Sequence, residues 1–583
     1  MLNSSTKDYI STNIKNAVSE LYNLSDLNFV VEYPQNPQYG DYATNVCLIL
    51  KSKVHKTSEY LSKELIKHLK NKLDDNIINK ISYVEPGFIN FSFSQKFLLS
   101  QLNQRDVVYD YQISKENILI EYSQPNPNKP QHIGHARNNF LGSTIANLYE
   151  YLGHNVIKAN YYNDWSTAVC KSMLMYEMYY KNKDLSNINN QKSDHFVGDL
   201  YILYSKIEQE NSLISAKVQE MFQNLEKGDK YTTQLWEKIT NMVYKGWETT
   251  YKDQNVFFDV IFRQSDYKIS GKDIIDLAIK KGIAAKDKTG AVVANLKKYN
   301  LPDKVLLRSD GTSIYITQDL QLAVDTFNKY KLDKRLYVVD NRQADYFKQL
   351  FKILEMLEYK FYDKVFHISY GFVSLPQGKM SSRTGVVVNA DDAFEQIIKH
   401  EEKEIEKSVK ELSNKQDTIK KIALSAFRYA ILKVDPKKDV VFVYDQVTKF
   451  EGNTGPYLMY TYARMNSLIT KSNRLQEVLN IDFSKLNSLQ HFDISLQKEY
   501  DILRHITKFN EIVLTSAIDY SPNILANFLF ELSQKYNSFY SSTKILTNNH
   551  NTEADFRLIL TLKTCEILKK GLELLGIEVV NKM

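Results

Sequence analysis

The chain has 583 residues, which is too long for one domain and indicates three or four. Hydrophobic residues make up 43% and charged residues 25%, the proportions of an ordinary soluble globular protein. The formal net charge is only +6, so charge alone does not indicate a nucleic-acid-binding protein. Cys47, Cys170 and Cys565 have neither zinc-ligand spacing nor a disulfide pattern. With no signal peptide and no apolar run long enough to cross a membrane, they favour a cytoplasmic protein.

Residues 1 to about 112 are predicted to form a small α+β domain. Amphipathic helices are expected over residues 8–24 and 56–72. Residues 39–46 and 83–94 carry turn and strand signals, and INFSF alternates as a half-buried strand does. These patterns leave open whether the domain binds a partner or only packs.

A strand, loop, helix and strand are predicted over residues 117–163. An apolar run at 117–122 has the length of a buried strand, and the prolines and asparagines of SQPNPNKPQ form a loop. Apolar residues then recur at helical spacing from Ile133 until Gly153, a C-cap residue, and the next strand covers 155–162. This βαβ unit predicts a parallel sheet with ligands at the strand ends.

The segment His132-Ile133-Gly134-His135 lies where this helix begins. A helix N-terminus offers free N–H groups and a positive dipole end to an anion, and glycine allows a ligand to approach the backbone. The two imidazoles can donate hydrogen bonds to phosphate oxygens. A surface histidine pair, or half of a metal site, is the alternative.

Residues from about 171 to 265 are mostly helical in pattern and lack the strands of a β-barrel domain. Strands are predicted again in AVVANL, KVLLRSDGTSIYIT, RLYVVD and KVFHISYGFVSL. We expect YITQD, residues 315–319, to end a strand and open a helix, which would put its tyrosine and carboxylate in the ligand crevice. An ordinary N-cap aspartate is the alternative.

The loop GKMSSRTG, residues 378–385, follows a strand, and its Lys and Arg can reach phosphates. Its alternative is a plain surface loop. Residues 392–420 are predicted to be a charged helical connector, and the chain is expected to be helical from there to its end.

HIGH after a strand, together with GKMSSRTG, resembles the class I aminoacyl-tRNA synthetases. The run EYSQPNPNKPQHIGHARNNFLG resembles the arginyl-tRNA synthetases more specifically, as do residues 450–465 and the ending GLELLGIEVVNKM. The resemblance covers nearly the whole chain. It implies an α/β multidomain fold with a Rossmann-like catalytic core. The implied domains are a tRNA-elbow-binding domain (1–112), the catalytic domain with its helical insertion (113–391, insertion about 171–265), and a connector with an anticodon-binding bundle (392–583, bundle core about 455–583).

The resemblance implies that the chain joins L-arginine to tRNA(Arg) through an arginyl-adenylate made from ATP. Its implied catalytic residues are His132, His135, Lys379 and Lys129. Its implied ATP-binding residues are His132, Gly134, His135, Lys379, Met380, Ser381 and Ser382. Its implied arginine-binding residues are Glu121, Ser123, Asn126, His132, Tyr315, Asp319 and Gln343. A guanidinium is permanently charged and carries five donors, so Glu121 and Asp319 are the two carboxylates expected to bind it.

Two positions depart from the family pattern. Ala168 stands where some members have Gln, so only Asn163 and Asp164 are carried over from that segment. Ser382 replaces the second lysine of the Lys-Met-Ser-Lys-Ser motif, and Lys129, just before HIGH, is predicted to supply the missing charge.

The resemblance further implies that Mg²⁺ accompanies ATP and that activation requires tRNA. A monomer with no bound zinc, no other metal site and no membrane contact is expected. Two other readings stay open. A glutamyl or glutaminyl synthetase of the same class would need a cation where Glu121 and Asp319 stand. A non-catalytic tRNA-binding paralogue could have lost His132, His135 or Lys379, and all three are present.

Overall fold

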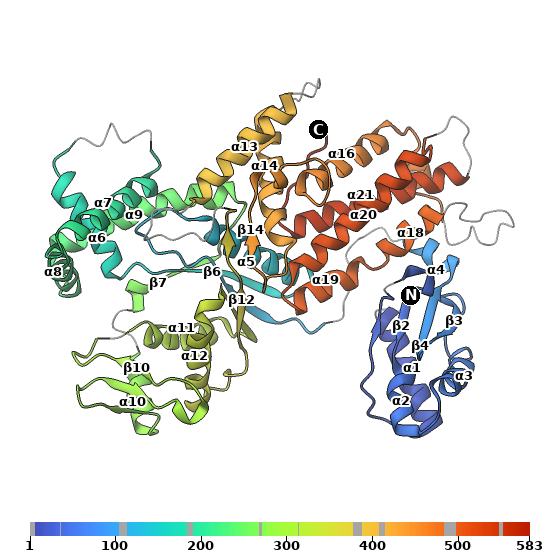
Figure 1. Ribbon diagram of the computed structural model, residues 1–583, viewed down its shortest axis with the longest axis horizontal. Coiled ribbons are helices and arrows are strands. Elements are labelled where there is room, and N and C mark those ends of the chain that lie inside the picture. Colours follow the sequence, from blue (N-terminus) through green and yellow to red (C-terminus); the bar gives the residue numbers. More distant parts are fainter. Residues whose placement is uncertain are drawn as a thin grey trace.

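The structure is a computed structural model that describes residues 6–34, 36–103, 113–183, 191–267, 271–312, 314–376, 388–406, 414–482, 497–546 and 552–583. Figure 1 shows its helices and strands grouped into an N-terminal domain, a central α/β region with a helical insertion, and a C-terminal helical region. Within the described ranges, every helix is too short or too polar to cross a lipid bilayer.

The N-terminal domain is the expected α+β unit. Its sheet has the order β1-β2-β4-β3 and is antiparallel throughout. Ile89, Phe91 and Phe93 of INFSF are buried, as the alternation predicts, although Asn90 between them is buried as well. Its elements are α1 (Thr6–Tyr22), β1 (Val31–Glu32), η1 (Pro37–Tyr39), β2 (Tyr42–Thr44), α2 (Val46–Val54), α3 (Ser58–Leu69), β3 (Ile78–Val84), β4 (Phe88–Phe93), α4 (Gln95–Ser100) and η2 (Gln101–Asn103).

A five-stranded sheet of order β12-β11-β5-β6-β7 forms the centre of the α/β region, and all its neighbouring pairs are parallel. The strands are β5 (Asn117–Glu121), β6 (Asn155–Tyr162), β7 (Val260–Arg263), β11 (Lys334–Asp340) and β12 (Val365–Tyr370). The predicted βαβ unit is confirmed, because α5 (Ile133–Tyr151) connects β5 to β6. Gly153, with φ +93°, donates to the Glu150 carbonyl and His154 donates to the Tyr149 carbonyl, which is a Schellman ending for α5.

The helical insertion consists of α6 (Thr167–Tyr179), α7 (Ser193–Glu210), α8 (Ile214–Glu226) and α9 (Lys230–Asp253). Its helical character is confirmed. The expected end near residue 265 is wrong, because β7 already lies in the central sheet. A four-residue edge strand has too few alternating residues to be recognised beside long helices.

A separate antiparallel sheet contains two of the predicted strands. The order β10-β9-β8 joins β8 (Ala284–Lys286), β9 (Val292–Ala294) and β10 (Lys304–Leu307), beside α10 (Lys272–Lys280). The strand expected in YIT is wrong: Tyr315 begins α11 (Tyr315–Tyr330), and Ile314 is its N-cap residue. Ile316, Leu320, Ala323 and Phe327 form the buried stripe of that helix. Asp319 is therefore not a cap but projects from the second turn.

β13 (Val373–Ser374) and β14 (Val440–Val441) pair in parallel, and the other described elements of the C-terminal part are helices. β13 lies within the strand predicted at KVFHISYGFVSL, and β14 is the exception, among the described residues, to the helical C-terminal region that the sequence predicts. The helices are α12 (Ala344–Met356), α13 (Ala390–Glu406), α14 (Lys415–Leu432), α15 (Tyr444–Val447), α16 (Gly455–Lys471), α17 (Leu475–Val478), α18 (Gln497–Ile506), α19 (Phe509–Ile518), α20 (Pro522–Ser542) and α21 (Thr552–Leu574).

Buried polar contacts join the C-terminal helices to the other regions. Arg428 on α14 has no exposed surface and donates to Ser143 Oγ of α5 (2.9 Å), to the Gln254 carbonyl (2.8 Å) and to the Leu575 carbonyl (2.9 Å). Glu511 of α19 accepts hydrogen bonds from the hydroxyls of Tyr33 (2.7 Å) and Tyr42 (2.6 Å) in the N-terminal domain. The bundle thus contacts both the N-terminal domain and the helix that begins with HIGH.

Candidate active site

A cavity of about 880 Å³ lies at the carboxyl ends of β5, β6, β11 and β12. Every predicted catalytic, ATP-binding or arginine-binding residue that the structure describes lines it: Glu121, Ser123, Asn126, Lys129, His132, Gly134, His135, Tyr315, Asp319 and Gln343. The other four predicted residues, Lys379, Met380, Ser381 and Ser382, lie outside the described residues. Segments 200 residues apart in sequence therefore meet at the edge where parallel sheets bind ligands.

A strained turn carries the chain out of β5 into the cavity. Ser123 and Gln124 have φ of +80° and +48°, a left-handed conformation that costs non-glycine residues about 1 kcal/mol or more each. Side chains of the neighbouring elements stabilise the turn: the Ser123 N–H donates to Asn138 Oδ1 (2.9 Å), and the Gln124 N–H donates to Asn160 Oδ1 (3.0 Å). Backbone strain of this kind is concentrated at functional sites.

The two HIGH histidines cap their own helix. The His135 N–H donates to His132 Nδ1 (3.3 Å), the His132 N–H donates to His135 Nδ1 (3.1 Å), and the rings stack with centroids 3.8 Å apart. A neutral imidazole has one donor and one acceptor nitrogen, so an accepting Nδ1 leaves the proton on Nε2. Each ring can then donate through Nε2–H without being charged.

The electrostatics of the site favour this neutral form. Burial, together with the positive charges of Lys129 and Arg342, lowers the pKa of His132 to about 4. Burial also holds the pKa of His135 well below its ordinary value, with contributions from His132 and Lys129. A side chain at position 134 would clash with this arrangement, because a Cβ there would lie 2.9 Å from the His132 ring.

Arg342 is a further cation at the end of the cavity where the two histidines lie, and the sequence does not predict it. Its Nε and Nη2 donate to the two carboxylate oxygens of Asp340 (3.0 and 2.8 Å), and its guanidinium lies 4.8 Å from the Phe372 ring centre. Asp340 and Arg342 lie in the same short segment as Gln343, VVDNRQ, where no local pattern distinguishes Arg342 from a surface arginine. A second cation beside Lys129 therefore faces the histidines.

Glu121, expected to bind a guanidinium, is already bonded to one. Its Oε2 accepts from Arg335 Nη2 (2.5 Å), and its Oε1 accepts from the Gln124 side chain (3.0 Å). The Arg335 side chain has no exposed surface and also donates to Thr326 Oγ1. Local patterns do not identify Arg335, whose only signal in the sequence is an arginine within the apolar strand β11.

Asp319 is the second carboxylate expected to bind the guanidinium, and it makes no ion pair with any described residue. It accepts a hydrogen bond from the Tyr346 hydroxyl, and burial raises its pKa to about 7. The hydroxyls of Tyr161 and Tyr337, which also line the cavity, are buried and have no hydrogen-bond partner in the described structure. Unsatisfied donors beside an unpaired carboxylate are what a polar ligand would complete.

The carried-over pair Asn163 and Asp164 divides between two roles. Asn163 lines the cavity and donates to the Gln124 carbonyl (3.2 Å). Asp164 has no exposed surface and accepts from the Tyr244 hydroxyl (3.0 Å) and the Ser265 N–H (2.9 Å). Asp164 therefore joins β6 to α9 and to the segment after β7, away from the cavity.

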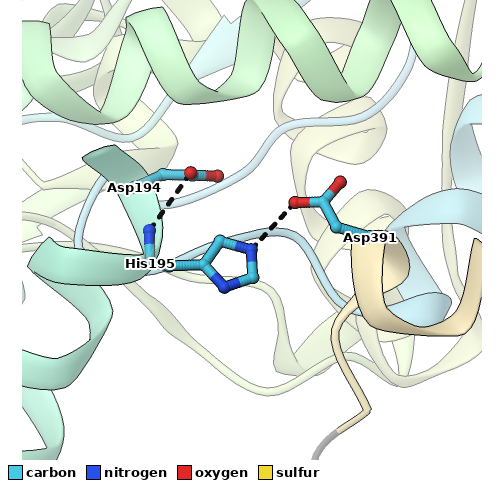
Figure 2. Close-up of side chains that lie close together, drawn as sticks. All are labelled: Asp194, His195 and Asp391. Atoms are coloured by element: carbon cyan, nitrogen blue, oxygen red, sulfur yellow. Dashed lines mark hydrogen bonds and ion pairs between the residues drawn. The ribbon is translucent and has the colours of Figure 1, made fainter. Parts of the chain in front are cut away.

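A second cluster of ionisable side chains lies between α7 and α13 (Figure 2). His195 Nε2 lies 2.9 Å from Asp391 Oδ2, and Asp194 lies beside them. The Lys192 ammonium donates to both Asp391 (2.7 Å) and Asp194 (3.2 Å), and the Thr250 hydroxyl donates to Asp391 (2.9 Å). A lysine cation therefore already pairs with both carboxylates, and the cluster is an ion-pair network that ties the insertion to α13.

Three family models match consecutive parts of the chain. The model described as the catalytic domain of class I (R) tRNA synthetases matches residues 98–444. The arginyl tRNA synthetase N-terminal domain matches residues 8–93, and the DALR anticodon binding domain matches residues 458–583. Together they follow the order of the regions seen in the structure.

Known proteins agree with these matches. The arginine–tRNA ligase of Borrelia hermsii is 31% identical over 593 residues, covering 99% of this chain and 98% of the relative. That of Bacteroides fragilis is 36% identical over 529 residues, covering 85% and 86%. The solved arginyl-tRNA synthetase of Thermus thermophilus has the same fold, with a TM-score of 0.82 at 22% identity over 99% of this chain and 100% of that one. The chain belongs to the arginine–tRNA ligases, a family of class I aminoacyl-tRNA synthetases.

Proposed function

We propose that this chain activates L-arginine with ATP in the cavity described above and transfers the arginyl group to the 3′-terminal adenosine of tRNA(Arg). The observation that carries this assignment is the polarity of the cavity. One end holds the unpaired Asp319 beside two unsatisfied tyrosine hydroxyls, and the other end holds neutral imidazoles and two cations. A cationic side chain suits the first end, and a triphosphate suits the second.

The chemistry needs no proton abstraction, because arginine's carboxylate is already an anion. One of its oxygens forms a bond to the α-phosphorus of ATP while the bond to the bridging oxygen breaks, and pyrophosphate leaves with that electron pair. The Nε2–H groups of His132 and His135 donate to the phosphate oxygens on which charge develops, and Lys129 and Arg342 supply positive charge. Preorganised donors and charges of this kind lower a barrier without further reorganisation.

The amino-acid end is proposed to recognise the guanidinium through Asp319, with Tyr315 and Gln343 as further ligands. Glu121 belongs to the same set, because a carboxylate has about four lone-pair sites and the chain's own contacts occupy only two of them. Ser123 and Asn126 line the cavity from the segment that follows β5, and we place the substrate's amino and carboxylate groups beside them.

Mg²⁺ is proposed to enter with ATP and to be held by its phosphates. Near the histidines, the only carboxylate among the described lining residues is Asp340, and both of its oxygens accept hydrogen bonds from Arg342. The described part of this end thus offers cations rather than metal ligands. A bound metal would add charge neutralisation at the phosphates.

The C-terminal bundle is proposed to bind the anticodon arm, and the N-terminal domain is proposed to contact the tRNA elbow. On α16 and α20, the Arg464 guanidinium lies 4.8 Å from the Tyr460 ring centre and 5.0 Å from the Tyr540 ring centre. Both tyrosines are exposed, so the face can stack on unpaired bases. We further propose a monomer, and we propose a cytoplasmic location, which the three buried and unpaired cysteines support.

Arginine-dependent ATP–pyrophosphate exchange, measured with and without tRNA, tests this function directly. We expect exchange with arginine, no exchange with glutamate or glutamine, and esterification of tRNA(Arg) by arginine. Exchange that appears only when tRNA is added would support the inferred requirement for tRNA. Absence of both exchange and esterification with every tRNA tested would contradict the assignment.

A further inference from the structure

Lys304 brings a positive charge into the arginine end of the cavity from outside the central sheet. It lies on β10 of the small antiparallel sheet, and its ammonium is 5.0 Å from the centre of the Tyr346 ring. The hydroxyl of that same Tyr346 donates to Asp319. Lys304 lines the cavity and forms no ion pair with any described residue.

The two carboxylates of this end differ in how their charge is balanced. Glu121 is bonded directly to the buried guanidinium of Arg335. Asp319 is bonded to a neutral tyrosine, and the charges of Lys304 and Arg335 act on it only through space. Lys304 and Arg335 therefore attract the Asp319 carboxylate, but neither donates a hydrogen bond to it in the described structure.

We propose that Lys304 is a specificity-determining residue: its charge acts on Asp319 through space, and it disfavours the ammonium of lysine or ornithine more than the guanidinium of arginine, which gains hydrogen bonds to Asp319. The inference rests on the proposed function, because it takes Asp319 as the ligand of the substrate's side chain. No other described cation is both close to Asp319 and uncommitted, since Arg335 is bonded to Glu121.

The discrimination follows from the shapes of the two cations. A guanidinium is a planar fork that can donate two parallel hydrogen bonds to one carboxylate, so arginine gains contacts that Lys304 does not make. The ammonium of a lysine substrate would offer Asp319 only a point charge and would face Lys304 across the cavity. Like charges brought together in a site are a repulsive element that rejects the wrong ligand.

The test compares Lys304→Met with the wild-type chain. Methionine keeps the unbranched shape of the lysine stem and removes the ammonium charge. We expect the ratio of kcat/KM for arginine to that for lysine, measured by tRNA esterification, to fall by about tenfold or more, because like-charge repulsion at an interface costs this much or more. Inhibition by ornithine should strengthen to a similar degree. Inhibition by citrulline, the neutral analogue of arginine, should not change.

Lys352→Met is the matched control. Lys352 also lies over a tyrosine, 3.9 Å from the Tyr299 ring centre, but it does not line the cavity. It should leave the arginine-to-lysine ratio unchanged. Thermal unfolding and the KM for ATP show whether Lys304→Met has folded normally, and inhibition constants can be measured even when turnover is slow.

The outcomes separate this inference from the function on which it rests. If the wild-type chain does not esterify tRNA with arginine, the proposed function fails. If it does, but Asp319→Asn leaves the KM for arginine unchanged, the placement of arginine fails. If both hold and Lys304→Met keeps the arginine-to-lysine ratio of the wild-type chain, Lys304 has no part in specificity.

Discussion

Replacing Asp319 by asparagine should change affinity and stability in opposite directions. Asparagine keeps the shape and an acceptor for the Tyr346 hydroxyl but removes the charge. A hydrogen bond to a charged group contributes about 1.5–3 kcal/mol, so the KM for arginine should rise by about 10- to 150-fold. The KM for ATP should stay nearly constant, because the cavity's other end is intact.

The stability of the ligand-free protein should increase in the same variant. Folding raises the pKa of Asp319 from 3.8 to about 7, so the carboxyl favours the folded state below pH 3.8 and loses that contribution as the pH rises to about 7. The difference of about three pH units corresponds to at most about 4 kcal/mol above pH 7. Asp319→Asn removes this destabilisation.

Two assays together decide the point. Steady-state esterification of tRNA at varied arginine and ATP gives the two KM values, and thermal unfolding at pH 8 without ligands gives the stability. We expect a raised arginine KM with a raised Tm. Equal losses for arginine and ATP, or a lowered Tm, would show that Asp319 supports the fold instead of binding the substrate.

The remaining predictions concern pH, the phosphate end, the bundle connector and editing. In the wild-type chain, kcat/KM for arginine should fall about tenfold per pH unit below about pH 7 as Asp319 takes up a proton, and Asp319→Asn should lack this limb. Lys129→Ala should slow adenylate formation about a hundredfold, the typical effect of losing one preorganised donor, and Ser382→Lys should restore part of it; normal exchange in Lys129→Ala would refute the role. Glu401 of α13 is buried without a described partner, and burial raises its pKa to about 8, so its stabilising contribution is lost as the pH rises from 4.5 to 8. Glu401→Gln should therefore raise the Tm at pH 9 more than at pH 4, and an equal shift at both would disprove ionisation as the cause. The pure protein should not hydrolyse mischarged tRNA, because a polar pocket rejects mismatched side chains unaided; detectable hydrolysis would overturn this.

Local signals predicted the elements that carry the site. The spacing of Phe140, Leu141, Ile145 and Leu148 predicted α5, and Gly153 predicted its end, because helix periodicity and capping depend on neighbouring residues. YITQD was assigned wrongly in part, since three β-favouring residues in a row conceal the first turn of a helix whose buried stripe extends ten residues further.

Long-range partners could not be predicted from local patterns. Arg335 lies 214 residues from Glu121, and only the pairing of β11 with β5 brings them together. Lys304 reaches the cavity from a sheet that the sequence analysis did not separate from the central one. Such charges decide which carboxylate of the site is free of an ion pair.

Arg428 and its neighbours join the HIGH helix to the last residues of the chain, and this has a consequence for folding during synthesis. The HIGH helix is linked to residues made much later, for example through Thr144, whose hydroxyl donates to the Leu575 carbonyl 431 residues further on. At about 5–20 residues per second, a ribosome takes roughly 20–90 s to make that interval. Until then, the side chains of Thr144 and Asn147 lack these partners. The regions named along the sequence are therefore not interchangeable modules, and a catalytic domain cut from this chain would leave Ser143, Thr144 and Asn147 without their final partners.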